Sequence, residues 1–221
     1  MPETLFHFDR PETVVDWSAI DDRVMGGVSR SALRFDPAGH AVFSGQVSPD
    51  NNGGFASVRA SVSPPPGADI DAIELVVRGD GRRYKLNLRT DRGFDGVNYQ
   101  AAFAPPAGQW ATLRLSLDVF QPSWRGRAVP DAPPLRGARI EQVGLMIADR
   151  QFGAFALAIG AIWAQRAGEG GDMRQPGEPV ARHARRCAVR AERAPVARPG
   201  RAPSAASSPH TATAANRAPR S

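Results

Sequence analysis

The segment Trp17–Arg30 holds the densest group of side chains that could do chemistry. Its adjacent carboxylates, Asp21 and Asp22, could hold a hard cation or a partner's arginine, and Gly26-Gly27 would let another backbone approach closely. A structural role is the alternative: Asp21 would cap a turn, Arg23 would pair with a carboxylate, and the glycines would form a bulge. Two carboxylates alone do not make a calcium site, which needs about six to eight oxygen ligands.

The segment Asn51–Arg59 joins a glycine-rich loop to a candidate strand. Its two glycines do not stand between a strand and a helix, so we exclude a phosphate-binding loop. Phe55, Ser57 and Arg59 occupy alternate positions and therefore share one face of that strand.

The segment Arg78–Arg89 has a Gly79-Asp80-Gly81 turn between two strand-like runs, which predicts a β-hairpin. In the second run Tyr84 shares a face with two leucines, and polar residues occupy the opposite face at alternate positions from Arg83 to Arg89. The polar row either faces solvent or lines a groove that suits an anionic or hydroxyl-rich ligand or an acidic protein surface.

A tryptophan with two neighbouring arginines stands in a proline-rich segment that begins at Phe120. Trp124, Arg125 and Arg127 combine a large flat ring with bidentate donors, which is typical of binding hot spots. The alternative is that Trp124 packs on the edge of a sheet and fixes the loop.

Catalytic constellations are missing from the sequence. The four histidines are scattered, and the single cysteine, Cys187, lies near the C-terminus. We expect no catalytic residues, no metal site and no cofactor, and one cysteine cannot form an internal disulfide. The chain is interpreted as a protein that binds rather than catalyses.

A scaffold of strands is needed to position these segments. About ten runs of strand length are separated by Gly-, Pro- and Asn-rich turns without a helical period, which predicts an all-β antiparallel sandwich or jelly roll. The last run is apolar on both faces, so we expect a central strand that closes the domain. The expected strands are Leu5–Phe8, Ser31–Phe35, Ala41–Val47, Gly54–Val62, Ala72–Arg78, Arg83–Arg89, Val97–Phe103, Trp110–Leu117, Glu141–Ile147 and Ala154–Ala164.

The net charge of +6 over 221 residues arises at the C-terminal end. Residues 166–221 hold 11 arginines against 4 acidic residues, so residues 1–165 are close to neutral. The C-terminal region is rich in Ala, Arg, Pro and Ser and has no aromatic residue, so it cannot bury enough apolar surface to offset its chain entropy. We expect one folded domain over residues 1–165 and a disordered tail over 166–221.

The sequence also carries signals about cellular location. No run of about 18 apolar residues predicts a membrane span, although a peripheral association stays open. The acidic N-terminal stretch matches neither a secretory signal nor a transit peptide, and the strong bias of arginine over the sole lysine, Lys85, is typical of a GC-rich bacterial genome. We expect a cytoplasmic bacterial protein, and the basic tail by itself predicts no specific nucleic-acid binding.

Taken together, these segments resemble the CIA30 family, the complex I intermediate-associated protein 30 domain. The resemblance covers about residues 5–164. Its markers occur in order as Trp17, Asp21-Asp22-Arg23-Val24-Met25-Gly26-Gly27-Val28-Ser29, Phe43-Ser44-Gly45, Asn51-Asn52-Gly53-Gly54-Phe55-Ala56-Ser57-Val58-Arg59, Arg78-Gly79-Asp80-Gly81, Tyr84-Lys85-Leu86, Tyr99-Gln100, Phe120, Trp124-Arg125-Gly126-Arg127, Ile140 and Gly144-Leu145-Met146-Ile147-Ala148-Asp149.

The resemblance implies a galactose-binding-like jelly-roll sandwich and a role like that of NADH dehydrogenase assembly factors, which hold intermediates. The implied partners are proteins, namely respiratory-complex subunits or assembly intermediates. We expect the polar segments to form one recognition surface. Its expected residues are Asp21, Asp22, Arg23, Met25, Gly26, Gly27, Ser29, Asn52, Gly53, Gly54, Phe55, Ser57, Arg59, Arg78, Asp80, Tyr84, Lys85, Asn87, Gln100, Trp124, Arg125 and Arg127.

The alternative function is a small-ligand module that binds a carbohydrate or a nucleotide on one face of the sandwich. It rests on the polar row of the Arg78–Arg89 segment and on aromatic rings that could stack on a ligand. The stacking candidates are Tyr84, Tyr99 and Trp124.

Overall fold

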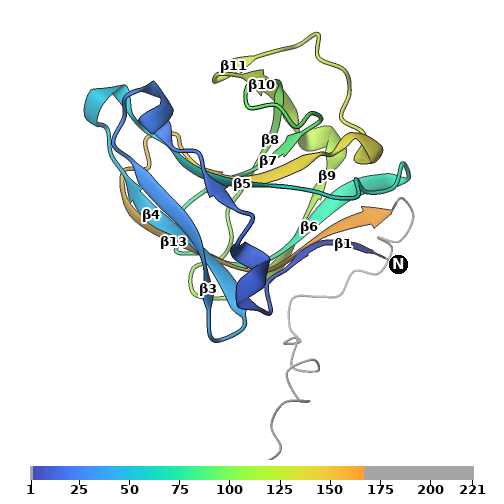
Figure 1. Cartoon of the computed structure of the whole chain (residues 1–221), viewed down its shortest axis with the longest axis horizontal. Helices are drawn as coiled ribbons and strands as arrows, with labels where there is room; N and C mark the ends of the chain where they lie inside the picture. The colour runs from blue at the N-terminus through green and yellow to red at the C-terminus, as the bar shows by residue number, and fades with distance from the viewer. Residues whose placement is uncertain (1, 167–221) are drawn as a thin grey trace, which may run out of the picture. The chain divides into compact units, whose positions relative to one another are not determined.

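The computed structural model describes residues 2–166, which form two packed antiparallel β-sheets (Figure 1). Sheet A has six strands, in the order β3 (Arg30–Asp36), β4 (His40–Val47), β13 (Gly153–Arg166), β6 (Ile70–Arg78) and β9 (Trp110–Ser116), with β1 (Glu3–His7) also paired to β13. Sheet B has seven strands, in the order β11 (Arg127–Ala128), β10 (Gln121–Trp124), β8 (Asn98–Phe103), β7 (Tyr84–Arg89), β12 (Gln142–Ile147), β5 (Ala56–Ser61) and β2 (Ser18–Ala19).

Helical residues within 2–166 are confined to five short 3-10 turns. These are η1 (Pro11–Val14), η2 (Asp22–Met25), η3 (Asp50–Asn52), η4 (Leu117–Val119) and η5 (Gly137–Arg139). The prediction of an all-β antiparallel sandwich is therefore confirmed, and each of the ten expected strands is present with its ends shifted by a few residues at most.

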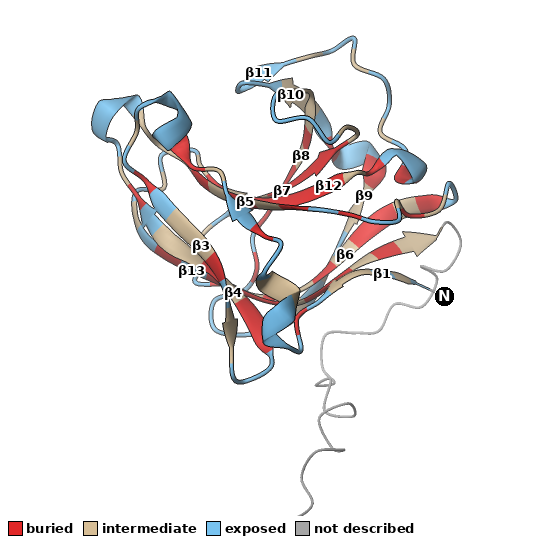
Figure 2. Ribbon diagram, viewed as in Figure 1, coloured by how far each residue is buried: buried red, intermediate tan, exposed pale blue. Residues whose placement is uncertain are grey.

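The core lies between the two sheets, where the buried residues of Figure 2 gather. Strand β7 shows why, because Tyr84, Leu86 and Leu88 alternate with polar residues and all three are fully buried. Tyr84 makes edge contacts with Phe43 and Phe155 of sheet A, with ring centroids 6.4 Å apart in both pairs. Aromatic rings therefore help to hold the two sheets together.

Strand β13 is the central strand of sheet A, as its apolar sequence predicted. On one side, the first half of β13 pairs with β4 and its second half pairs with β1. On its other side, β13 pairs with β6. A bulge at Gly160 separates the two halves, and the Gly160 carbonyl accepts a hydrogen bond of 3.0 Å from the Phe8 amide. The bulge thus marks the place where one neighbouring strand replaces another.

The predicted hairpin over Arg78–Arg89 is wrong. Strand β6 belongs to sheet A and β7 to sheet B, so the Gly79-Asp80-Gly81 turn carries the chain from one sheet to the other. The Asp80 carboxylate accepts hydrogen bonds from the Arg82 amide at 3.0 Å and from the Ala156 amide of β13 at 2.9 Å. A tight-turn signature shows that the chain reverses, but it does not show which strand the returning segment will pair with.

Three short strands were not expected from the sequence, namely β2, β10 and β11. Each has two to four residues, which is too short to show an alternating pattern. The expected tail over 166–221 lies, beyond Arg166, outside the described residues, and so does Cys187.

Replacing Leu157 with alanine should destabilise the sandwich by about 2–5 kcal/mol, because its fully buried side chain in β13 would leave a cavity between the sheets. Urea unfolding measures the change. The matched control is Ala156→Ser at the exposed neighbouring position, which should change the free energy of unfolding by less than about 0.5 kcal/mol. Equal losses for the two variants would contradict the assignment of faces.

Candidate functional site

The carboxylate of Asp22 lies at the centre of the segments that the sequence singled out. Asp22 is fully buried at the start of η2. One oxygen accepts a hydrogen bond from the Ser29 amide at 2.9 Å, and the other accepts from the Ser29 hydroxyl and from the Gly54 amide at 2.8 Å. The Phe55 amide contributes a longer bond of 3.4 Å to the second oxygen. One side chain therefore joins two loops that are about 30 residues apart in the sequence.

Two of the expected glycines are needed because Asp22 is so closely surrounded. A Cβ atom at Gly27 would lie 2.4 Å from the Asp22 carboxyl carbon, and a Cβ at Gly53 would lie 2.6 Å from its Oδ2. Both distances are far below van der Waals contact, so a side chain at either position would displace the carboxylate. A third glycine, Gly26, ends η2 with a φ of 90°, in the left-handed region that glycine adopts without strain.

Asp21 makes a second set of contacts beside the first. Its carboxylate accepts hydrogen bonds from the Ser31 amide at 2.9 Å, the Ser31 hydroxyl at 2.6 Å and the Ser57 amide at 3.0 Å. Ser31 belongs to sheet A and Ser57 to sheet B, so Asp21 connects the two sheets. We call this group the aspartate joint, and its members are Asp21, Asp22, Ser29, Ser31, Gly54, Phe55 and Ser57.

The electrostatics of Asp22 favour the ionised carboxylate at neutral pH. Burial opposes its ionisation, but the hydrogen bonds from Ser29, Gly54 and Phe55 outweigh that effect and lower the pKa of Asp22 below its usual value. Because the oxygens of Asp21 and Asp22 are already bonded inside the protein, a structural role describes them better than direct contact with a cation or a partner. The form of that role differs from the expected one, since Asp21 bonds Ser31 and Ser57 and its side chain does not cap η2. Within residues 2–166 no group of three or more His, Cys, Asp or Glu side chains is placed to hold a metal ion.

The aspartate joint holds an exposed apolar loop in place. Val24 and Met25 of η2 are 58% and 64% exposed, and Val28 is also exposed. The loop is tied at both ends by Asp22 and Ser29, and the Asn51 side-chain amide donates a hydrogen bond of 3.2 Å to the Gly26 carbonyl. We call Val24, Met25 and Val28 the apolar loop. Of these, the sequence analysis had named only Met25 as a contact residue.

The outer face of sheet B carries a second group of expected residues. Strand pairing aligns Arg59, Gly144, Asn87 and Gln100 in one row across β5, β12, β7 and β8. Lys85 lies in the next row, which it shares with Met146 and Ser57, and it forms an ion pair of 2.7 Å with Asp149. The polar row predicted for β7 therefore lies on the outside of sheet B, opposite the core.

The loop 90–97 folds over part of this outer face. Arg89 is almost completely buried beneath it and donates hydrogen bonds of 2.9 Å to the Phe94 carbonyl and to Asp91. Phe94 is 65% exposed, and the guanidinium of Arg59 lies over its ring. The guanidinium carbon is 5.8 Å from the centroid of the ring. Phe94 was missed because it stands in a Gly- and Asp-rich turn segment, but a large apolar residue in such a segment was itself a signal.

The Trp124 segment lies at the far edge of sheet B. Trp124 is 42% exposed and donates a hydrogen bond of 2.9 Å from its ring nitrogen to Asp95, which also pairs with Arg125. Arg127 faces Trp124 across the β10–β11 pair. Six strand spacings, about 29 Å, separate β11 from β2 beside the aspartate joint, so the Trp124 segment is not adjacent to the apolar loop.

Three expected residues lie elsewhere. Arg78 belongs to sheet A and lies over the ring of Trp110 at 5.2 Å, and Asp80 holds the crossover between the sheets. Tyr84 is fully buried in the core, so it cannot contact a partner, and burial raises the pKa of its hydroxyl group. Tyr99 is also in the core, which leaves Trp124 as the sole exposed member of the three proposed stacking residues.

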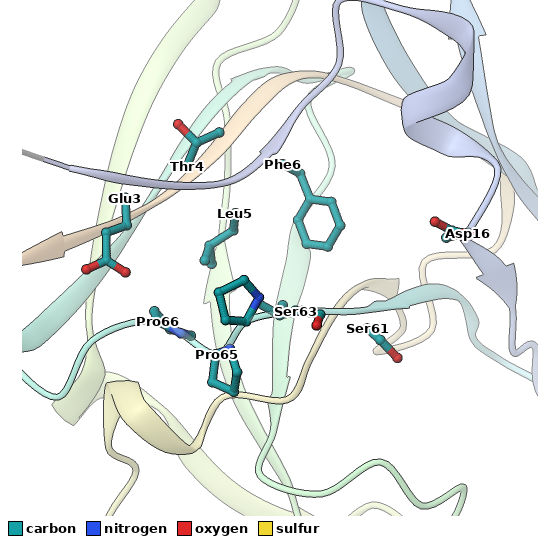
Figure 3. A pocket seen from close by; sticks show the side chains of 11 residues that line it. Glu3, Thr4, Leu5, Phe6, Asp16, Ser61, Ser63, Pro65 and Pro66 are labelled. Carbon is teal, nitrogen blue, oxygen red and sulfur yellow. The ribbon is translucent and has the colours of Figure 1, made fainter.

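A cavity of about 320 Å³ lies apart from all these residues, between β1 and the turn at Pro64–Pro66 (Figure 3). Leu5 and Phe6 line it, with Glu3 near one end and Asp16 near the other. Glu3 accepts hydrogen bonds from Arg166 and from the Gly67 amide, and these contacts lower its pKa. None of the residues expected from the sequence lines this cavity.

Comparison with known proteins identifies the family. The family model described as Complex I intermediate-associated protein 30 (CIA30) matches residues 6–159. The chain belongs to the CIA30 family. The match takes in the whole of the aspartate joint and every strand in full except β1 and β13, which extend beyond its two ends.

Two curated relatives carry the name "Complex I intermediate-associated protein 30, mitochondrial". The protein from Neurospora crassa is 23% identical over 203 residues, which covers 74% of this CIA30 chain and 73% of the relative. The protein from Drosophila melanogaster is 24% identical over 179 residues, which covers 71% of this chain but 60% of the relative.

Solved structures with a similar fold include the family 11 carbohydrate-binding module of Clostridium thermocellum. The module in complex with a β-1,3-1,4-mixed-linked tetrasaccharide matches with a TM-score of 0.56 at 16% identity. The match covers 75% of this chain and 96% of the module. The module of the cellulase Lic26A-Cel5E matches with a TM-score of 0.57 at 16% identity. The match covers 76% of this chain and 95% of the module. These matches establish the galactose-binding-like jelly-roll sandwich.

In the part of the chain that the structure describes, no helix is long and apolar enough to cross a membrane.

Changing Asp22 to asparagine should destabilise the domain by about 1–3 kcal/mol at neutral pH, because an amide group would face the hydrogen-bond donors of Ser29 and Gly54. The lowered pKa of Asp22 means that its stabilising effect is present above the unfolded-state value and is lost as the pH falls through the folded-state value. The difference between the wild type and the variant should therefore shrink below about pH 4.

Urea unfolding at a series of pH values measures this difference. Asp50→Asn is the matched control, since Asp50 is exposed in η3, and it should leave the free energy of unfolding nearly unchanged. A stability difference between the wild type and Asp22→Asn that stays constant down to pH 3 would argue against an ionised, hydrogen-bonded Asp22.

Proposed function

We propose that this CIA30 domain is a protein-binding module that holds assembly intermediates of respiratory complex I and acts without catalysis. One observation carries the proposal: Val24, Met25 and Val28 are exposed on a loop whose backbone is fixed by a fully buried carboxylate. Neighbouring apolar side chains that protrude from a firmly held loop are suited to bury themselves in a partner.

The rigidity of the loop matters for binding. A loop that is already ordered loses little conformational freedom when a partner covers it, so more of the apolar burial appears as affinity. Methionine adapts well to irregular apolar surfaces, which suits Met25 at a protein interface. The structural role of Asp22 and the binding role of Met25 are thus two parts of one arrangement.

The identity of the proposed partner comes from the family. Curated relatives of this chain are named for their association with complex I intermediates, and the matched region includes the apolar loop. The small-ligand alternative has less support, because Tyr84 and Tyr99 are buried and cannot stack on a sugar or a base. A protein partner can use the apolar loop, which offers few polar groups to a carbohydrate.

Replacing both Val24 and Met25 with serine should weaken capture of complex I subunits at least about tenfold, because the loss of two apolar contacts removes more than 1.4 kcal/mol of binding free energy. The measurement is affinity capture of the full chain from cells that encode it, with quantitative mass spectrometry of complex I subunits. Both side chains are exposed, so the melting temperature should change little.

The control is Val119→Ser, which changes an exposed valine in η4 between β9 and β10. It should capture complex I subunits as the wild type does. Equal capture by the wild type and the Val24 and Met25 double variant, or the absence of complex I subunits from every capture, would argue against the proposal. Trp124→Ala in the same experiment shows whether the partner also reaches the far edge of sheet B.

A further inference from the structure

The cations on and around the outer face of sheet B differ in whether they have an acidic partner. Lys85 pairs with Asp149 at 2.7 Å, Arg89 with Asp91 at 2.9 Å, and Arg92 with Glu141 at 2.8 Å. Arg125 pairs with Asp95 at the far edge. No ion pair or hydrogen bond joins the guanidinium of Arg59 to another of the described residues. Arg83 and Arg127 also lack an ion pair among these residues, but both are exposed, whereas Arg59 is partly buried.

The surroundings of Arg59 make the lack of a partner costly. Its side chain is partly buried, and its neighbour on β12 is Gly144, where a Cβ atom would lie 3.0 Å from the Val58 carbonyl oxygen and 3.6 Å from the Cβ of Arg59. Burial, followed by repulsion from Arg89, lowers the pKa of Arg59, while attraction to Asp91 acts in the opposite direction. An arginine stays charged under these conditions, so the free domain contains a partly desolvated cation without a counter-ion.

Other polar atoms close to Arg59 also lack partners. Asn87 occupies the same cross-strand row and is more than nine-tenths buried, and its side-chain oxygen accepts no hydrogen bond. Arg89 and Asn98 face each other in the next cross-strand row. The Nε atom of Arg89 and the side-chain oxygen of Asn98 are also buried without a hydrogen-bond partner. Three buried polar atoms of these two neighbouring rows therefore have no hydrogen-bond partner among the described residues.

We propose that Arg59, with the exposed ring of Phe94 beside it, binds the carboxylate side chain of an acidic segment in the protein partner. A carboxylate would form a charge-assisted, bidentate pair with the guanidinium, and an apolar neighbour in the same segment would cover Phe94. This inference rests on the proposed function, since it supplies the chemistry of a second contact with that partner. Arg59 lies two residues along β5 from Ser57, whose amide bonds Asp21 in the segment that also carries the apolar loop.

Charge favours a carboxylate over a phosphate at this position. One unpaired guanidinium matches one negative charge, and Asp91, which pairs with Arg89, already acts on Arg59 electrostatically. A phosphate dianion would bring a second negative charge near the Asp91 carboxylate and would meet stronger repulsion than a single carboxylate. It would also leave the ring of Phe94 uncovered.

The test is a nuclear magnetic resonance titration of the full, ¹⁵N-labelled chain with the peptide acetyl-Ala-Glu-Leu-amide. We expect saturable shifts of the Arg59, Asn87 and Gly144 amides. The matched peptide acetyl-Ala-Gln-Leu-amide should bind about tenfold more weakly, because it lacks the charge. Inorganic phosphate should bind more weakly than the Glu peptide.

Arg59→Gln should abolish the saturable shifts, and Arg34→Gln, at an exposed position on β3 of sheet A, should preserve them. A structural role of Arg59 is tested separately, since removal of an unpaired, partly desolvated cation should leave the melting temperature equal or higher. Equal binding of the Glu and Gln peptides, tighter binding of phosphate, or binding by Arg59→Gln would overturn the inference.

The two proposals fail in different ways. If the full chain captures complex I subunits through the apolar loop but the Glu peptide does not bind, the Arg59 inference is wrong and the proposed function stands. If the Glu peptide binds at Arg59 but no complex I subunit is captured, the acidic-segment site is supported and the complex I role is wrong.

Discussion

The architecture of this domain depends on one buried carboxylate that accepts hydrogen bonds from two distant loops. Asp22 binds Ser29 ahead of β3 in sheet A and Gly54 ahead of β5 in sheet B, so its loss would release an edge of both sheets together. A buried charge is costly unless it is fully hydrogen-bonded, and that requirement explains why Gly27 and Gly53 carry no side chain. The most recognisable motifs of the CIA30 family in this chain therefore encode an internal joint, and the residues that they leave exposed are the ones available to a partner.

Buried and exposed side chains are separated within a few residues of each other. Asp21, Asp22 and Ser29 face inward, whereas Val24 and Met25 protrude from the same turn. Sheet B extends this division, because its inner face is apolar and its outer face carries Arg59 and the overlying Phe94. In the proposed function, a partner contacts these outward side chains through their position and charge.

The sequence predicted the sandwich well, because alternation in segments such as Tyr84–Arg89 depends only on which side chains face the core. It failed at Gly79-Asp80-Gly81, since a turn signature does not encode the sheet that the next strand joins. It grouped Asp22 with Gly53 and Gly54 as one site but could not show that they meet inside the protein. Phe94 and Arg59 come together only through the fold of the loop 90–97, a long-range contact that no local pattern reveals.

Native-state amide hydrogen exchange tests the role of the aspartate joint most directly. If the two carboxylates hold both sheets, the amides of Ser29, Ser31, Gly54 and Ser57 should exchange slowly and with similar opening free energies, although Ser29 and Gly54 lie in loops. Exchange of the Ser29 and Gly54 amides at the rate of an unprotected loop, while β3 and β5 stay protected, would contradict the account.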